Sequence, residues 1–194
     1  MNTDNDKKMN YYDFMPAALK EAEKGAAAGD IPVGAVAVYD NKIIAAAHNT
    51  KEAEGDPTAH AEILCLRQAA EYLGSWHLEG VTLFVTMEPC PMCAGAILQA
   101  RIKTLVFGCF DAKWGCCGSK LNALEPGLFN HNTEVISGIM EEECKALVRD
   151  FFRDKRNLEH RNELTDDLRE DEIIDRVAKK ILKEHIDAFK ELAK

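Results

Sequence analysis

Residues 82–101 read TLFVTMEPCPMCAGAILQAR. The segment from Val81 to Thr86, at the start of this stretch, is rich in β-branched and aromatic residues, which is typical of a buried strand. Pro91 to Arg101 is predicted to be a short helix, because proline suits the first helical turn, where its missing N–H costs nothing. Cys90 and Cys93 therefore lie where a strand gives way to a helix. Positions i and i+3 are neighbours on a helix face, so both sulfur atoms can reach one metal ion.

Strands and helices alternate on both sides of this stretch. The apolar spacing predicts further helices at Tyr11 to Ala28, Thr58 to Tyr72 and Met140 to about His160. Further strands are predicted at 31–39, Lys42 to Ala47, Lys103 to Phe107 and Thr133 to Ile136. Asp40-Asn41 is a tight-turn signal between the first two of these strands. The alternation predicts an α/β fold, with a sheet covered by helices on both faces.

Composition limits the function classes. The 194 residues are 46% apolar, which suits one compact domain with a full core and excludes a largely disordered chain. The net charge of −9 excludes a generally basic coat, so any nucleic-acid contact must be local, and DNA is not an expected partner. No window approaches the roughly 18 apolar residues of a membrane helix. The N-terminus has no apolar signal core, so we expect a cytoplasmic protein whose seven cysteines are thiols or metal ligands.

Two thiols do not complete a zinc site, and His60 is the best third ligand because it lies at a predicted helix start. Two sulfurs and one nitrogen leave a fourth position open, as in catalytic zinc sites. Glu62 lies two residues beyond His60 and can reach a water molecule on the open side. A carboxylate there can take a proton from that water and deliver it to a leaving group. The alternatives are a thiol–disulfide redox pair and a histidine packed in the core.

The pattern H-x-E followed by P-C-x-x-C resembles the zinc nucleobase deaminases. The resemblance to the bacterial tRNA-specific adenosine deaminases is closer and covers about residues 11–162. It is carried by 31–39, 56–62, 82–101, 107–119, Phe129-Asn130-His131 and 150–156. That family converts the wobble adenosine of a tRNA anticodon to inosine. It implies a three-layer cytidine-deaminase-like fold, with a mixed five-stranded sheet between helices.

The resemblance also implies a role for each matching residue. His60, Cys90 and Cys93 would bind zinc, one ion per subunit, and Glu62 would be the catalytic proton shuttle. The substrate-binding residues would be Val33, Asn49, Ala61, Pro89, Asp111, Lys113, Phe151, Arg153 and Arg156. Among these, Asn49 would bind the base edge, Val33 would wall the pocket, and Asp111 and Lys113 would hold the sugar and phosphate. The implied partners are a tRNA anticodon stem-loop and a second copy of the chain in a homodimer.

We divide the chain into a flexible N-terminal tail (1–9), a zinc-dependent deaminase domain (10–162) and an amphipathic C-terminal helical extension (163–194). The extension is predicted to pack on its own domain, or else to bind a partner or a second copy. Asp154 and Glu159 interrupt the basic stretch that precedes it, which is a departure from the family.

Several expectations have plainer alternatives. Asn49 could cap a turn, Phe151 could be a core aromatic, and Arg153 and Arg156 could belong to a solvated helix face. Trp114 has no role in the family pattern and is either a stacking platform or a surface aromatic. The competing functions are deamination of a free base or nucleotide, such as guanine or cytosine, and an inactive zinc module that binds RNA. The metal motif is common to these two functions and to deamination of tRNA, so it does not distinguish them.

Overall fold

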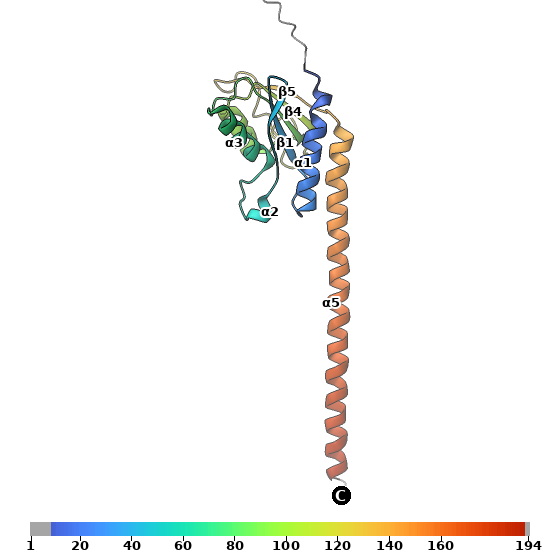
Figure 1. Ribbon diagram of the computed structural model, residues 1–194. Helices are drawn as coiled ribbons and strands as arrows, with labels where there is room; N and C mark the ends of the chain where they lie inside the picture. Colours follow the sequence, from blue (N-terminus) through green and yellow to red (C-terminus); the bar gives the residue numbers. More distant parts are fainter. Residues whose placement is uncertain (1–8, 193–194) are drawn as a thin grey trace, which may run out of the picture. The chain divides into compact units, whose positions relative to one another are not determined.

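The computed structural model describes residues 9–192, with the side chains of 163–168, 184 and 187–192 excepted. Its centre is a mixed sheet in the order β2-β1-β3-β4-β5 (Figure 1). The strands are β1 (Gly34–Tyr39), β2 (Lys42–His48), β3 (Thr82–Met87), β4 (Thr104–Cys109) and β5 (Glu134–Ile136). β1 is antiparallel to both β2 and β3, whereas β3, β4 and β5 run parallel. The predicted mixed five-stranded sheet is confirmed.

The helices begin with a 3₁₀ turn, Tyr11–Asp13. They continue as α1 (Met15–Ala27), α2 (Lys51–Glu54), α3 (Ala61–Leu73), α4 (Pro91–Gln99) and α5 (Glu141–Leu192). α3 starts later than predicted because Thr58 donates both its N–H and its hydroxyl to Asp56, which holds it in a turn. α2 lies between the predicted strand Lys42 to Ala47 and the predicted helix Thr58 to Tyr72, where no helix or strand was predicted. α5 is continuous through the two predicted C-terminal segments, since neither glycine nor proline interrupts residues 141–192.

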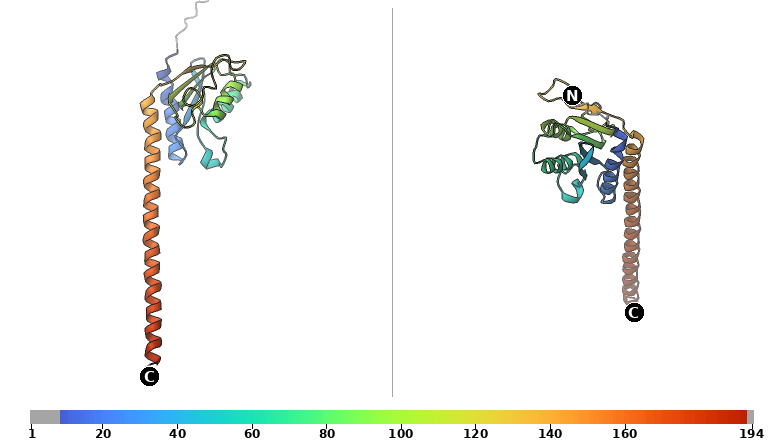
Figure 2. Two further views of the ribbon diagram at one scale, coloured as in Figure 1. Left: turned by 180° about the vertical axis from the view of Figure 1, so that it is seen from behind. Right: turned by 45° about the horizontal axis from the view of Figure 1, so that its top comes forward.

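Side chains alternate across the sheet and build two apolar layers. The ribbon views show α1 and α3 on opposite faces of the sheet (Figures 1 and 2). Leu83 and Val85 of β3 face the layer that contains α3 and α4. Phe84, between them, faces the opposite layer, together with Met15 of α1 and Cys144 in the first turn of α5. Strands buried on both faces read as continuous apolar runs, which is why β3 and β4 were recognisable from sequence. The predicted helix layers on both faces are confirmed.

The turn between β1 and β2 follows from two residues. Asp40 and Asn41 both have positive φ, at 49° and 56°. Two consecutive positive φ values are those of a type I′ turn, whose twist matches that of the flanking strands. The predicted hairpin is therefore confirmed, and it leads β2 back to His48, next to the residues that border the site described below.

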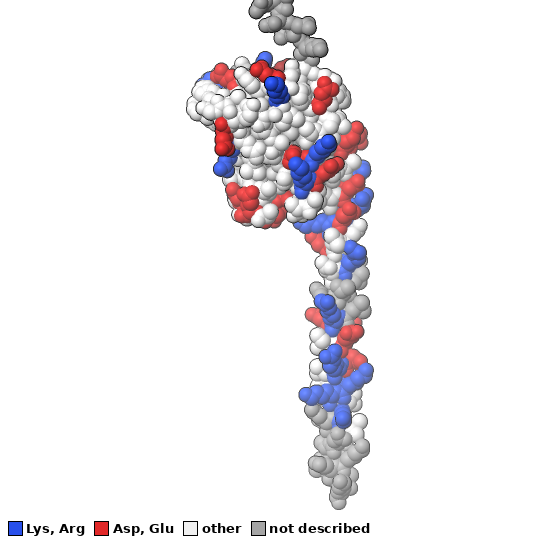
Figure 3. All heavy atoms as spheres, viewed as in Figure 1, with Lys and Arg blue, Asp and Glu red and all other residues white. Residues whose placement is uncertain are grey.

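The described part of the chain forms two compact units, of which the first ends at Phe151 and the second begins at Phe152. The second unit consists of the greater part of α5, along which basic and acidic side chains are interspersed (Figure 3). Its large described apolar side chains are exposed: Phe152, Leu158, Ile173, Ile174, Val177, Ile181, Leu182 and Ile186. Phe189 and Leu192, which belong to the predicted amphipathic extension, lie outside the described side chains, and residues 1–8 of the predicted N-terminal tail lie outside the described residues. Among the described helices, none has an apolar stretch long enough to cross a membrane.

One glycine permits the contact between α1 and β1. A Cβ atom built on Gly34 would lie 2.1 Å from the carbonyl oxygen of Ala18 and 2.4 Å from the backbone nitrogen of Ala22. Backbone atoms cannot yield as a flexible side chain can. The close approach of helix to sheet thus depends on the missing side chain, and Gly34 also donates its N–H to the hydroxyl of Thr86.

We expect Gly34→Ala to lower the free energy of unfolding by about 1–3 kcal/mol or more, because α1 must shift away from β1. Gly95→Ala is the matched control. Gly95 lies within α4, and its Cβ would meet no atom within 4 Å, so alanine should be neutral or stabilise by about 0.5–1 kcal/mol. Urea unfolding monitored by circular dichroism measures both. Equal stability of the two variants would contradict this account of the helix contact.

Candidate active site

The N-termini of α3 and α4 lie close together, and residues at these two N-termini form a cluster of metal donors. His60 is the N-cap of α3 and Cys90 is the N-cap of α4. The Nδ1 atom of His60 lies 3.8 Å from the sulfur of Cys90 and 3.6 Å from the sulfur of Cys93. All three donor atoms lie within 4.8 Å of one another. The structure therefore brings together the three residues that the sequence predicted as ligands.

The donor spacing suits a tetrahedral zinc ion. Zinc–sulfur bonds of about 2.3 Å and zinc–nitrogen bonds of about 2.0–2.1 Å place two tetrahedral ligands about 3.6 Å apart. The observed nitrogen–sulfur separations of 3.8 and 3.6 Å agree with this value. The hydrogen bond from Cys93 is the main cause that lowers the pKa of Cys90 to about 4. A thiolate at a helix N-terminus is the form of cysteine that binds metal.

Glu62 carries a carboxyl group close to this cluster in sequence. It is buried, and it occupies the first turn of α3, two residues beyond His60. Burial is the main cause that raises the pKa of its carboxyl to about 7. A carboxyl group with a pKa near neutrality can both accept and release a proton, as acid–base catalysis requires.

His60, Cys90 and Glu62 line a cavity of about 620 Å³. That volume lies within the range of small-molecule sites. Its lining comprises Ile31, Val33, Asn49, Lys51, Pro57, His60, Glu62, Met87, Glu88, Cys90, Pro91, Met92, Asp111 and Trp114. Of the substrate-binding residues predicted from sequence, Val33, Asn49 and Asp111 are present. Within residues 9–151, the lining does not include four others: Ala61, Pro89, Lys113 and Phe151.

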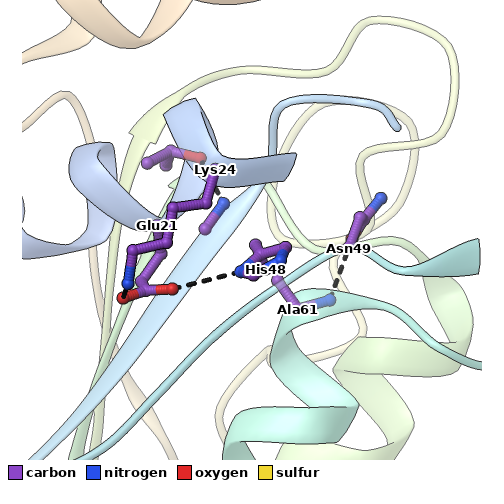
Figure 4. A network of polar contacts seen from close by, with 7 residues as sticks. Glu21, Lys24, His48, Asn49 and Ala61 are labelled. Carbon is purple, nitrogen blue, oxygen red and sulfur yellow. Dashed lines mark hydrogen bonds and ion pairs between the residues drawn. The ribbon is translucent and has the colours of Figure 1, made fainter. Parts of the chain in front are cut away.

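Asn49 has a structural contact as well as a place at the cavity. Its side-chain oxygen accepts the N–H of Ala61 at 2.8 Å, which fixes the end of β2 to the first residue of α3 (Figure 4). This contact occupies the backbone N–H of Ala61, a residue that the family resemblance predicted to bind substrate. The preceding residue, His48, pairs with Glu21 of α1 at 3.1 Å. Asn49 is thus fixed by its own contact with Ala61 and by the contact of the residue before it. Its amide NH₂ is directed away from Ala61.

Arg153 and Arg156 belong to the second unit, and both are exposed on α5. Arg153 pairs with Asp154 at 3.3 Å, the acidic residue that interrupts the basic stretch. Phe151 ends the first unit and is partly buried.

Glu88 is a site residue that the sequence reasoning missed. Its carboxylate accepts the N–H groups of Asp111, Cys117 and Ser119 at 2.9–3.0 Å, and the hydroxyl of Ser119. Burial would raise the pKa of this carboxyl, but these hydrogen bonds outweigh it and hold the pKa below its ordinary value. The only local signal was a carboxylate next to Pro89-Cys90. Lys51 was missed as well, because it lies in a stretch predicted to be loop.

Comparisons with known proteins agree with this geometry. The family model described as MafB19-like deaminase matches residues 9–156. A tRNA-specific adenosine deaminase of Bacillus subtilis is 50% identical over 143 residues, which cover 74% of this chain and 89% of the relative. A solved structure from a study of tRNA:A34 deaminases that edit the wobble position of transfer RNA is 41% identical. It has a TM-score of 0.67 and covers 70% of this chain and 98% of its own. The structure of guanine deaminase from Bacillus subtilis is 42% identical, with a TM-score of 0.50, over 53% of this chain and 66% of its own.

We expect the purified protein to hold about one zinc ion per chain, and Cys93→Ala to lose it, because two remaining donors do not retain zinc at a catalytic site. Cys144→Ala is the matched control. Cys144 is also buried, but it packs in the layer on the other side of the sheet. Elemental analysis by mass spectrometry after dialysis measures the zinc content. Wild-type zinc content in Cys93→Ala would disprove the ligand assignment.

Proposed function

Because this chain belongs to the tRNA-specific adenosine deaminases, we propose that it converts the wobble adenosine of a tRNA anticodon to inosine, with release of ammonia. One observation carries the proposal. The buried carboxyl of Glu62 lines the same cavity as His60 and Cys90, whose donor atoms form one cluster with the sulfur of Cys93. A metal donor set with an open position and an adjacent proton carrier is the equipment for hydrolysis at an sp² carbon.

The reaction exchanges an amino group for oxygen at C6 of adenine. Zinc, when bound to His60, Cys90 and Cys93, would lower the pKa of a water molecule and so make it nucleophilic at neutral pH. As the water oxygen bonds to C6, the C6–N1 double bond opens, and Glu62 carries one water proton to N1. Glu62 then carries the remaining proton from the C6 hydroxyl to the amino nitrogen; the C6–N bond breaks, the C6–O double bond forms, and ammonia leaves. Water and adenosine are consumed, and inosine and ammonia are formed.

The cavity lining would orient the base for this step. Asn49 would donate its NH₂ group to the base edge, since its side-chain oxygen already accepts the N–H of Ala61. Val33 is buried and forms an apolar wall. Asp111 would hold the sugar at the mouth of the cavity. Lys113, Arg153 and Arg156 are proposed to contact the RNA on either side of the target nucleotide, as local cations in a protein of net charge −9. Phe151 is proposed to contact the same RNA through its aromatic ring.

Further proposals concern the oligomeric state, the cellular location and the domain bounds. The chain would act as a homodimer in the cytoplasm, with residues of both copies near each site. Its deaminase domain would span 10–162 after a short tail. The segment 163–194 would be an amphipathic extension, whose described apolar side chains are exposed.

We expect a short anticodon stem-loop with adenosine at the wobble position to yield inosine, while free adenosine, adenine, guanine and cytidine remain unchanged. The physical reason is that contacts outside the base supply most of the affinity for the RNA. Chromatography of the digested RNA measures inosine, and a stem-loop with adenosine only elsewhere in the loop is the control. Turnover of guanine with the stem-loop untouched would replace the proposed substrate by a free base.

We expect Glu62→Gln to retain zinc and to lose about 10²–10⁴-fold in deamination rate, because the amide cannot carry the proton. Glu52→Gln is the matched control, since Glu52 is an exposed carboxylate on α2. Zinc content and single-turnover rates are measured on the same samples. A Glu62→Gln rate equal to wild type would exclude Glu62 as the proton shuttle.

A further inference from the structure

An exposed tryptophan lies at the cavity. Trp114 lines the cavity and yet has 68% of its surface exposed. A large aromatic side chain left in water loses the free energy that burial would give it. Neither the metal donors nor Glu62 explains its position.

The backbone beneath this tryptophan is held firmly. The N–H groups of Lys113 and Trp114 both donate to the carboxylate of Asp111, at 2.8 and 3.2 Å. The N–H of Asp111 in turn donates to Glu88, at 3.0 Å. Trp114 is therefore linked through two carboxylates to the segment that carries Cys90.

The next residue shows how closely the loop is packed against Glu88. A Cβ atom on Gly115 would lie 2.2 Å from a carboxylate oxygen of Glu88 and 2.5 Å from the carbonyl oxygen of Asp111. Only glycine fits at this point. The loop thus presents Trp114 from a backbone with little freedom to move, which lowers the entropy cost of binding on it.

We propose that Trp114 is a stacking platform for a nucleobase adjacent in the RNA to the one that enters the cavity. The inference rests on the proposed function, which requires a single-stranded segment to pass over the mouth of the cavity. Bases drawn out of a loop lose their stacking partners, and aromatic side chains replace them. A flat, exposed indole beside a base-sized cavity, on a fixed loop, has the chemistry for this role.

Trp114→Ala should lower kcat/KM for the stem-loop by about 5- to 150-fold, mainly through KM. Trp114→Phe should recover most of the loss, because a phenyl ring also stacks. Trp76→Ala is the matched control. The chain has two tryptophans, and Trp76 is similarly exposed, at 62%, but lines a separate groove beside α3 and α4. A kcat/KM of Trp114→Ala equal to that of Trp76→Ala would overturn the proposal.

A second measurement separates stacking from a structural effect on the loop. Stem-loops with an abasic nucleotide on the 5′ side or on the 3′ side of the wobble adenosine are assayed with wild type and Trp114→Ala. If Trp114 stacks on a flanking base, one abasic substrate abolishes the difference between the two proteins. If the difference persists unchanged on both abasic substrates, the platform is disproved.

Binding without turnover distinguishes failure of this proposal from failure of the proposed function. In the double variant Glu62→Gln and Trp76→Phe, Trp114 is the remaining tryptophan. Its fluorescence should be quenched by the intact stem-loop, and less by one of the two abasic stem-loops. Quenching without inosine formation by wild type would refute the reaction and retain the platform. Inosine formation by wild type, with fluorescence indifferent to both flanking bases, would refute the platform and retain the reaction.

Discussion

The site depends on the meeting of two helix N-termini. α3 and α4 follow different strands, and each begins with a metal donor at its N-cap, His60 in one and Cys90 in the other. The unpaired N–H groups of a first helical turn favour negative charge, which suits a thiolate and a nearby carboxylate. This arrangement needs α3 and α4 to share one face of the sheet, and the apolar layer of Cys65, Leu83, Val85 and Ile97 keeps them there. The chemistry of the site is therefore a consequence of the packing of one side of the sheet.

Glu88 extends this arrangement from the metal donors to the mouth of the cavity. The carboxylate of Glu88 accepts four hydrogen bonds from one loop. These bonds hold the loop more firmly than its backbone contacts alone would. The N–H of Cys116 adds a contact to the carbonyl oxygen of Pro89, at 2.9 Å. A long loop rich in glycine is ordinarily mobile, but here it is tied at several points to the residues that precede Cys90. A movement of either part would be transmitted to the other.

The net charge of −9 and an RNA substrate are compatible because binding needs only a local footprint. Lys51 lines the cavity, and Arg153 and Arg156 are exposed on the second unit. Acidic residues outnumber basic ones, 33 to 24, so the protein as a whole carries a net negative charge that opposes phosphate. An enzyme that must engage one loop of a folded RNA gains selectivity from such a distribution, since like-charge contacts disfavour other modes of binding.

The elements and the donors were predictable because their signals are local. The Asp40-Asn41 turn, the β-branched run of β3 and the i, i+3 spacing of Cys90 and Cys93 each depend on neighbours a few residues apart. His60 followed from the motif and from the donors that zinc requires. The partners of Glu88 lie 23 to 31 residues away, and the contact of Asn49 with Ala61 spans 12. No periodicity encodes such contacts, so the role of Glu88 and the orientation of Asn49 emerged only when the sheet and its helices brought those residues together. The sequence alone thus determined which chemistry is present, and the tertiary structure decided what holds it in place, because hydrogen bonds between distant segments form only in the packed chain.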